Sequence, residues 1–281
     1  MSDNIKELQK KILEIMEYFD LFCKENEITY YLMGGSALGA MRHQGFIPWD
    51  DDLDVFMTYD NYQKFLQACK TKLDTQRFYF QMENTEEFPM LFSKIRMNGT
   101  TFIEEGTKDR NMHKGIFVDI MCLNNASSNS VVRFIQYMAA RVVSTKALTR
   151  NGYYTNSKLK KMALFVAKYF ITDRMFDKLL KFVRSFNSKD YEVVGHFFGR
   201  AKFKNTSFSK SYLGRPRYVQ FDGMMLPVPE NVEAYLRVRF GDDYMKMPDE
   251  ATKSKYPIHA VYVNLNQDYS IYDAENNLNR G

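Results

Sequence analysis

Closely spaced aspartates are the first residues in this sequence whose pattern suggests chemistry. Residues 50–54 read DDDLD and run into the apolar pair Val55-Phe56. On a β-strand alternate side chains share a face, so Asp50, Asp52 and Asp54 line one side if the strand starts early enough. Oxygen ligands at that spacing favour one or two hard divalent cations. A solvated acidic turn is the alternative, but the apolar neighbours of Asp54 favour metal, because an unpaired buried carboxylate is costly.

A fifth acid, Asp119, interrupts the most apolar strand candidate of the chain, Gly115–Leu123 with the sequence GIFVDIMCL. Such a residue is either a structural carboxylate paired with Arg or Lys, or part of a site. Taken together with Asp52 and Asp54, we favour a role as a further metal ligand or as a general base.

The turn Gly34-Gly35-Ser36 lies between a predicted strand and a predicted short helix. Glycines allow the backbone to approach a phosphate, and N–H groups at a helix start face it. A tight turn without a ligand is the alternative. Four basic residues are candidates to complete a phosphate-binding site: Arg42, His43, Lys94 and Arg96. The alternative for each is a surface charge, and a core histidine or a base is a further alternative for His43.

The elements that must position these residues follow from hydrophobic periodicity. Strands with helices between them, in this order, predict an α+β fold. The predicted helices cover Ile5–Phe22, Ala37–Arg42, Asp60–Leu73, most of Val131–Ser185, and Pro229–Phe240. The predicted strands are Ile28–Met33, Leu53–Met57, Phe78–Met82, Met90–Met97, Thr101–Glu104, Gly115–Leu123 and a hairpin over Val219–Val228 that turns at Asp222-Gly223. Gly241–Pro248 and Pro257–Val263 are expected to close the fold. Asn124–Asn129 is expected to be a polar linker, and Phe203–Tyr218 a loop.

Charge is unevenly distributed along the 281 residues, whose net charge is +5. Thirteen basic and three acidic residues give the stretch from Val131 to Asp190 a net charge of +10, which leaves −5 for the remainder. This favours an anionic partner, and the apolar faces around Phe165 and Phe176 favour an anionic membrane surface. Two solvated helices are the alternative. No recognition motif accompanies the charge, so we do not expect nucleic acid as the partner.

The three cysteines are far apart and form no CxxC pair, which fits a reducing compartment. The amphipathic N-terminus has no apolar core of a signal peptide, and no run reaches the length of a membrane span. We therefore expect a cytoplasmic protein that associates peripherally with the inner face of the membrane. The sequence contains no HExxH, GxSxG or P-loop pattern.

Four blocks, in this order, resemble the LicD family, which includes the fukutin-related transferases. They are YYLMGGSALGAMRHQGFIPWDDDLDV from Tyr30, KIRMNGTTF from Lys94, KGIFVDIMCL from Lys114, and FDGMMLPVPENVEAYLRVRFGDDYMKMPDE, continuing to YPIH at His259. Gly35-Ser36 stands where many members have Gly-Thr.

The resemblance implies a nucleotidyltransferase-like mixed sheet flanked by helices, with the basic helices as an insert. Residues 1–125 would form the catalytic core, 126–205 the insert and 206–281 the part that completes the catalytic domain. Asp50, Asp52 and Asp54 resemble the metal-site acids of the family, and Asp119 its later strand carboxylate. Asp52, Asp54 and Asp119 are the predicted catalytic residues, with Mg²⁺ or Mn²⁺ as cofactor.

Family members transfer an alcohol phosphate, such as phosphocholine, from a CDP-alcohol to a sugar hydroxyl. The acceptor is a cell-surface glycan such as teichoic acid, lipopolysaccharide or capsule. We therefore expect a CDP-alcohol donor such as CDP-choline and a glycan or lipid-linked glycan acceptor. Two alternatives stay open: a nucleotidyltransferase that moves NMP, and a non-catalytic glycan- or membrane-binding module of the same fold.

Overall fold

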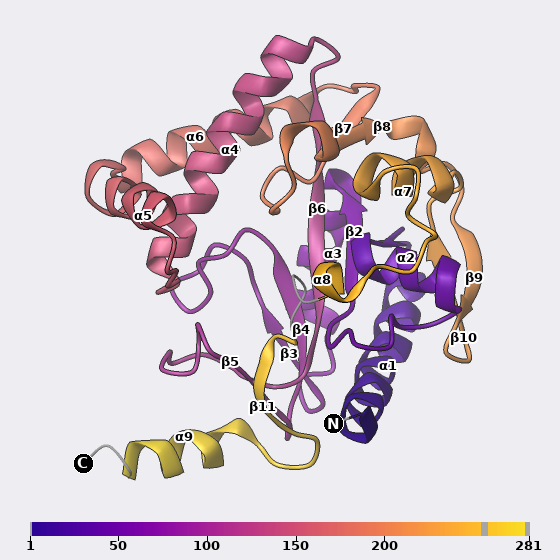
Figure 1. Cartoon of the computed structure of the whole chain (residues 1–281), viewed down its shortest axis with the longest axis vertical. Helices are drawn as coiled ribbons and strands as arrows, with labels where there is room; N and C mark the ends of the chain where they lie inside the picture. The colour runs from indigo at the N-terminus through magenta and orange to yellow at the C-terminus, as the bar shows by residue number, and fades with distance from the viewer. Residues whose placement is uncertain (1, 254–257, 279–281) are drawn as a thin grey trace.

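A computed structural model of the chain describes residues 2–253 and 258–278, and it confirms the predicted α+β class (Figure 1). Tyr256 and Pro257, which begin the YPIH block, lie outside the described residues. The helices are α1 (Ser2–Glu25), α2 (Gly34–His43), α3 (Tyr59–Lys72), α4 (Ser130–Arg150), α5 (Lys158–Phe170), α6 (Asp173–Ser185), α7 (Val232–Phe240), α8 (Glu250–Lys253) and α9 (Tyr269–Leu278). The strands are β1 (Tyr31–Leu32), β2 (Asp54–Thr58), β3 (Phe78–Gln81), β4 (Ser93–Met97), β5 (Thr101–Glu104), β6 (Phe117–Ala126), β7 (Val193–Gly195), β8 (Ser207–Ser209), β9 (Arg217–Phe221), β10 (Met224–Val228) and β11 (Ala260–Asn264).

The central sheet is mixed and has the strand order β1-β2-β6-β4-β3. Strand β6 lies between β2, with which it is parallel, and β4, with which it is antiparallel. Helices α1 and α3 both pack on β6, and Phe19 and Phe65 from these helices meet with ring centroids 5.7 Å apart. Both rings and Ile120 of β6 are almost wholly buried. This apolar layer fixes the strands that carry the site.

The basic segment forms a helical layer of its own beside the sheet. Helices α5 and α6 both pack against α4, and Val143, Phe176 and Leu180 belong to a separate small apolar cluster. The layer is joined to the sheet through β7, which pairs with the last three residues of β6. The predicted boundary between residues 125 and 126 thus falls within the last residues of β6.

Several predicted boundaries are wrong, and tertiary pairing explains the largest differences. Residues 124–126 were expected to be linker, yet they extend β6 because they pair with β7. The predicted loop from 203 to 218 contains β8, which pairs with β7. Strand β4 begins at Ser93, not at residue 90, and α2 begins at Gly34, so that the glycine turn is its first turn. The hairpin of β9 and β10 around Asp222-Gly223 is confirmed.

Strand β2 begins at Asp54, so residues 50–53 are not part of a strand. The strand therefore does not start early enough for three aspartates to line one side of it, and of Asp50, Asp52 and Asp54 only Asp54 is part of the sheet. Within residues 2–253 and 258–278, no helix combines the length and the apolar character needed to cross a membrane. All three cysteines are free and buried.

Candidate active site

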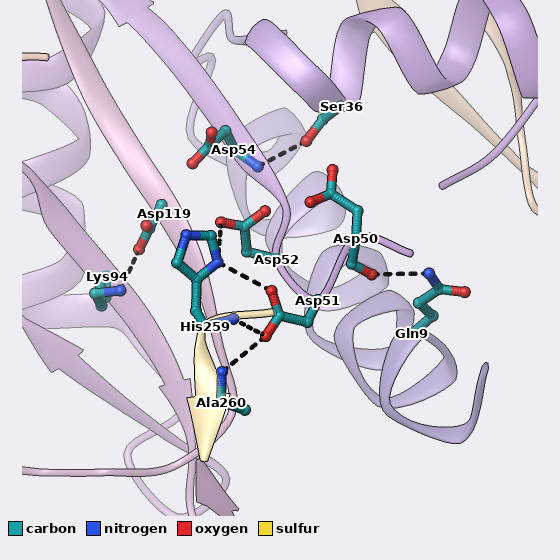
Figure 2. A network of polar contacts seen from close by, with 10 residues as sticks. All are labelled: Gln9, Ser36, Asp50, Asp51, Asp52, Asp54, Lys94, Asp119, His259 and Ala260. Atoms are coloured by element: carbon teal, nitrogen blue, oxygen red, sulfur yellow. Dashed lines mark hydrogen bonds and ion pairs between the residues drawn. The ribbon is translucent and has the colours of Figure 1, made fainter. Parts of the chain in front are cut away.

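Three charged side chains form a row across adjacent strands of the central sheet. In register, Asp54 of β2 pairs with Asp119 of β6, and Asp119 pairs with Lys94 of β4. Residues in register on neighbouring strands face the same side, so all three belong to one face. Lys94 Nζ lies 2.8 Å from Asp119 Oδ1, and both side chains are buried. Figure 2 shows this ion pair beside the aspartates of residues 50–54. The register thus brings Asp119 to Asp54.

The row of Asp54, Asp119 and Lys94 is called the acid row below. The start of α2 is bonded directly to it. Ser36 Oγ accepts a hydrogen bond from the backbone N–H of Asp54 at 2.9 Å, and the N–H of Met33 donates to the Asp54 carbonyl. Gly34 has a φ of 52° in the left-handed region, which favours glycine. A Cβ on Gly35 would lie 3.1 Å from Asp50 Oδ2, so the absent side chain leaves room for this carboxylate. The predicted glycine turn and the predicted acids are therefore neighbours.

Asp50 and Asp52 lie in the irregular segment before β2, and Asp51 between them turns the other way (Figure 2). The carboxylate of Asp51 is almost wholly buried and accepts hydrogen bonds from the N–H groups of His259 and Ala260, at 2.7 and 2.9 Å. It also contacts Nδ1 of His259 at 2.9 Å. Asp51 thus anchors the start of β11 beneath the site instead of lining it.

His259 is a site neighbour to which sequence reasoning gave no role. Its Nδ1 lies 3.5 Å from Asp52 Oδ2 in addition to its contact with Asp51. The hydrogen bond to Asp51 and the nearby charge of Asp52 raise the pKa of His259 to about 9. The residue closes the YPIH block of the family resemblance, which was the one available signal. A single histidine more than 200 residues from its partner has no spacing that reveals the contact.

Burial and mutual repulsion raise the pKa values of the site carboxyls. Burial, followed by the charges of Asp52 and Asp51, raises the pKa of Asp50 to about 8. Burial raises the pKa of Asp52, and raises that of Asp54 well above its usual range with help from Asp52 and Asp119. Burial raises the pKa of Asp119 to about 6, against the opposing effect of Lys94. Several carboxyls therefore share an environment that disfavours their charge.

A divalent cation fits this environment by donor type and by charge. Carboxylate oxygens are the ligands that Mg²⁺ and Mn²⁺ prefer, and a cation would offset the repulsion that raises the pKa values. The candidate ligands are Asp50, Asp52, Asp54 and Asp119. In the part of the chain that the structure describes, no three or more His, Cys, Asp or Glu side chains already stand as a group that could hold a metal ion.

Of the four predicted cationic phosphate contacts, Lys94 is the one placed in the acid row. Arg42 Nε donates to His43 Nε2 at 3.0 Å, and Arg42 Nη1 donates to the carbonyls of Tyr244 and Lys246. Burial lowers the pKa of His43, and the charge of Arg42 adds to this. Arg42 therefore holds the end of α2 against the loop of residues 244–246, and His43 accepts a hydrogen bond from Arg42.

Arg96 is buried on β4, two residues beyond Lys94. Its guanidinium donates to Gln81 Oε1 and to the Gly115 carbonyl, each at 2.7 Å, and lies over the ring of Phe117. These contacts lie within the protein core. Arg96 is therefore near the row, but its guanidinium is hydrogen-bonded to Gln81 of β3 and to Gly115, just before β6.

The part of the chain that carries these residues is similar to a known protein family. Residues 27–120 match the LicD/FKTN/FKRP family, nucleotidyltransferase domain. The chain carries a LicD-family domain. That domain contains every site residue predicted from the sequence, from Gly34 to Asp119, and confirms the resemblance stated above. Both His259 and the helical layer of α4–α6 lie outside the matched residues.

The similarity extends beyond the LicD-family domain. Over 263 residues the chain is 24% identical to lipopolysaccharide cholinephosphotransferase LicD of Haemophilus influenzae, covering 92% of this chain and 98% of that protein. A short segment of 43 residues is 46% identical to an uncharacterised protein of Rickettsia typhi, covering 15% of this chain and 14% of the other.

Proposed function

We propose that this protein is a transferase that moves phosphocholine or a related alcohol phosphate from a CDP-alcohol to a hydroxyl of a cell-surface glycan. The observation that carries the proposal is the row of Asp54, Asp119 and Lys94 beside the glycine turn, inside a LicD-family domain. The similarity of nearly the whole chain to a lipopolysaccharide cholinephosphotransferase supports phosphocholine as the group and a glycan as the acceptor.

In the proposed reaction, Asp52 and Asp54 would hold Mg²⁺ or Mn²⁺ with help from Asp50. The bound cation would supply charge neutralisation at the pyrophosphate of the donor. Gly34, Gly35 and Ser36 lie beside these acids at the start of α2. The N–H of Gly34 donates to Tyr235 Oη at 2.9 Å, so the backbone N–H groups of Gly35 and Ser36 are the ones proposed to contact phosphate. Catalysis by these residues is then chiefly positioning and electrostatic stabilisation.

Asp119 is proposed either to complete the ligand set or to accept the proton of the acceptor hydroxyl. Its ion pair with Lys94 fixes the carboxylate beside Asp54, and a pKa of about 6 suits a base that works near neutral pH. The sugar oxygen would form a bond to the phosphorus of the alcohol phosphate while the bond from that phosphorus to the CMP oxygen breaks. CMP leaves and the hydroxyl proton passes to Asp119.

The direct test is incubation of the purified protein with a panel of CDP-alcohols, Mg²⁺ or Mn²⁺, and a lipopolysaccharide or teichoic acid acceptor. The choline carries one isotopic label and the cytidine another. The proposal expects free CMP and label from choline on the acceptor, dependent on the divalent cation. A sound, folded protein that turns over no member of the panel would contradict it.

A nucleotidyltransferase that moves NMP is the second candidate, because the matched family domain is described by that activity. The same experiment separates the two, since cytidine label on the acceptor would support this candidate against ours. A non-catalytic module would be supported by absence of divalent-cation binding in calorimetry, with no difference between the wild type and Asp52→Asn.

An acceptor built on a lipid carrier would place the reaction at a membrane surface. We therefore propose that the protein works in the cytoplasm and associates peripherally with the inner face of the membrane. The basic helical layer of α4–α6 is the part of the chain whose charge suits such contact.

A further inference from the structure

Helix α5 presents a broad apolar face to solvent. The side chains of this face are exposed by between 46% and 79%. They are Leu159, Met162, Phe165, Val166, Tyr169 and Phe170. Their spacing of three, four and one residues places them on one side of the helix. Contiguous exposed apolar surface of this kind marks an interaction site in a folded protein.

The side of α5 that packs against α4 contributes few buried side chains. The large apolar side chains of the exposed face are therefore not needed for this packing. Ala167 is the buried residue of the helix, and Leu164 is half-buried beside it. The end of α5 is tied to α4 by Lys146, whose Nζ donates to the Lys168 carbonyl at 3.0 Å. The helix is thus held in place at its small-residue side, while its larger apolar side stays uncovered in the described residues.

Charge on the same helix indicates the chemistry of what covers it. α5 carries Lys158, Lys160, Lys161 and Lys168 and no acidic residue. Along α6, Arg174, Lys178 and Lys181 line a surface hollow together with Asp177. A helix with an apolar face and flanking lysines is typical of segments that lie in the plane of a membrane interface, where the apolar side enters the acyl boundary and the lysines reach anionic headgroups.

We propose that α5 docks in the plane of an anionic lipid surface through its apolar face and its flanking lysines. A second copy of the chain is disfavoured as the occupant, because face-to-face packing of two α5 helices would bring lysines against lysines. A nucleic acid is disfavoured because the exposed face is apolar, with its lysines beside it. The inference deepens the peripheral membrane association proposed above by naming the surface that makes the contact, and it does not depend on the transferase activity.

The test is flotation of the full-length protein with vesicles of phosphatidylcholine alone and of phosphatidylcholine mixed with phosphatidylglycerol. We expect flotation with the mixed vesicles and little with phosphatidylcholine. Phe165→Ser/Phe170→Ser should lose binding about tenfold or more. Lys158→Gln/Lys161→Gln should lose about thirtyfold on mixed vesicles, since each of the two lysines near such a surface contributes about 1 kcal/mol.

Matched controls come from other surfaces of the molecule. Met225→Ser on β10 removes an equally exposed apolar side chain, and Lys64→Gln/Lys70→Gln removes two exposed lysines from α3. Both should float like the wild type. Melting curves show whether each variant is folded. Vesicles contain no donor or acceptor, so failure of this inference and failure of the proposed function are seen in separate assays.

Three results would overturn the docking proposal. The first is a wild-type protein that stays in the soluble fraction with mixed vesicles. The second is binding that the lysine pair abolishes and the phenylalanine pair leaves unchanged, which would point to a general polyanion contact. The third is concentration-dependent self-association that Phe165→Ser/Phe170→Ser abolishes without vesicle binding in the wild type, which would make α5 an interface between copies.

Discussion

The acid row and helix α5 depart from ordinary burial in opposite directions. Around the row, Asp51, Lys94 and Asp119 are charged side chains with little exposure, whereas α5 leaves most of its apolar side chains in solvent. Both arrangements cost stability in the isolated chain, since buried charges are desolvated and exposed apolar surface stays hydrated. The comparison suggests that each region is shaped for a ligand: a cation and phosphates at the row, and lipid at α5.

The largest expected effect is on activity at the row. Asp54→Asn should lower the transfer rate by about 10²–10³-fold, because it removes a preorganised charge from the centre of the proposed site. Its melting temperature should stay the same or rise, since one of several crowded carboxylates is neutralised. The transfer assay and a thermal melt measure both quantities. Asp60→Asn, at an exposed position on α3, is the matched control and should retain wild-type activity. Near-normal turnover in Asp54→Asn would remove the row from the reaction.

A stability effect should follow from breaking the ion pair of Lys94 and Asp119. Lys94→Met leaves the Asp119 carboxylate buried without its partner, and such changes cost about 3–5 kcal/mol. Urea denaturation measures the loss. The double variant Lys94→Met/Asp119→Asn should regain a large part of it, because the unpaired charge is gone. Equal stability of the single and double variants would mean that the unpaired charge of Asp119 is not the cause of the loss.

The sequence predicted the parts of this site that depend on local pattern. The glycine turn, the acid-rich segment and the isolated Asp119 could be recognised in the sequence because each lies in or beside an apolar run. The fold class also followed from periodicity. The pairing of Asp54 with Asp119 could not be predicted, because it depends on the register of two parallel strands whose positions are set by tertiary packing.

Other features could not be predicted because their partners are remote or their local pattern misleads. His259 meets Asp51 across more than 200 residues. Asn124 and Asn125 have the composition of a linker, yet they are strand residues because β7 supplies their hydrogen bonds. Asp50, Asp52 and Asp54 have the spacing of one strand face, but residues 50–53 lie outside β2, and Asp51 turns toward β11. In each case a tertiary contact overrides the local preference.

A smaller effect is expected from pH on the metal-free protein. The folded pKa of Asp50, about 8, lies above its unfolded value of about 4, so the unfolded chain has already lost the proton that the folded chain keeps. The stabilisation that Asp50 contributes is therefore complete below its unfolded pKa and is lost as the pH rises through its folded pKa of about 8. His259, raised to about 9, changes stability in the same direction above its unfolded value of about 6.5.

The measurement is best made between pH 6.5 and 8. Burial lowers the folded pKa values of His113 and His196 to about 4 and about 3, so these two histidines change stability only below about pH 6.5. In chelator, we expect Asp50 to contribute a loss of about 2 kcal/mol across this window, or about 4 °C in melting temperature. His259 adds a further loss, which its partial exposure to solvent reduces. Asp50→Asn should remove the part of the slope due to Asp50 and leave the part due to His259. A melting temperature that rises across the window would contradict the crowding of these carboxyls.

The smallest expected effect is at Phe165 of α5, and a buried phenylalanine of α3, Phe65, is its reference. Phe65 of α3 is wholly buried, and Phe65→Ala should cost about 3–5 kcal/mol of unfolding free energy. Phe165 of α5 is 57% exposed, and Phe165→Ala should change it by no more than about 0.5 kcal/mol. Urea denaturation of both variants without lipid measures the difference. A large loss at Phe165 would mean that the fold itself needs this ring, and the apolar face of α5 would then belong to the core of the molecule instead of a surface kept for lipid.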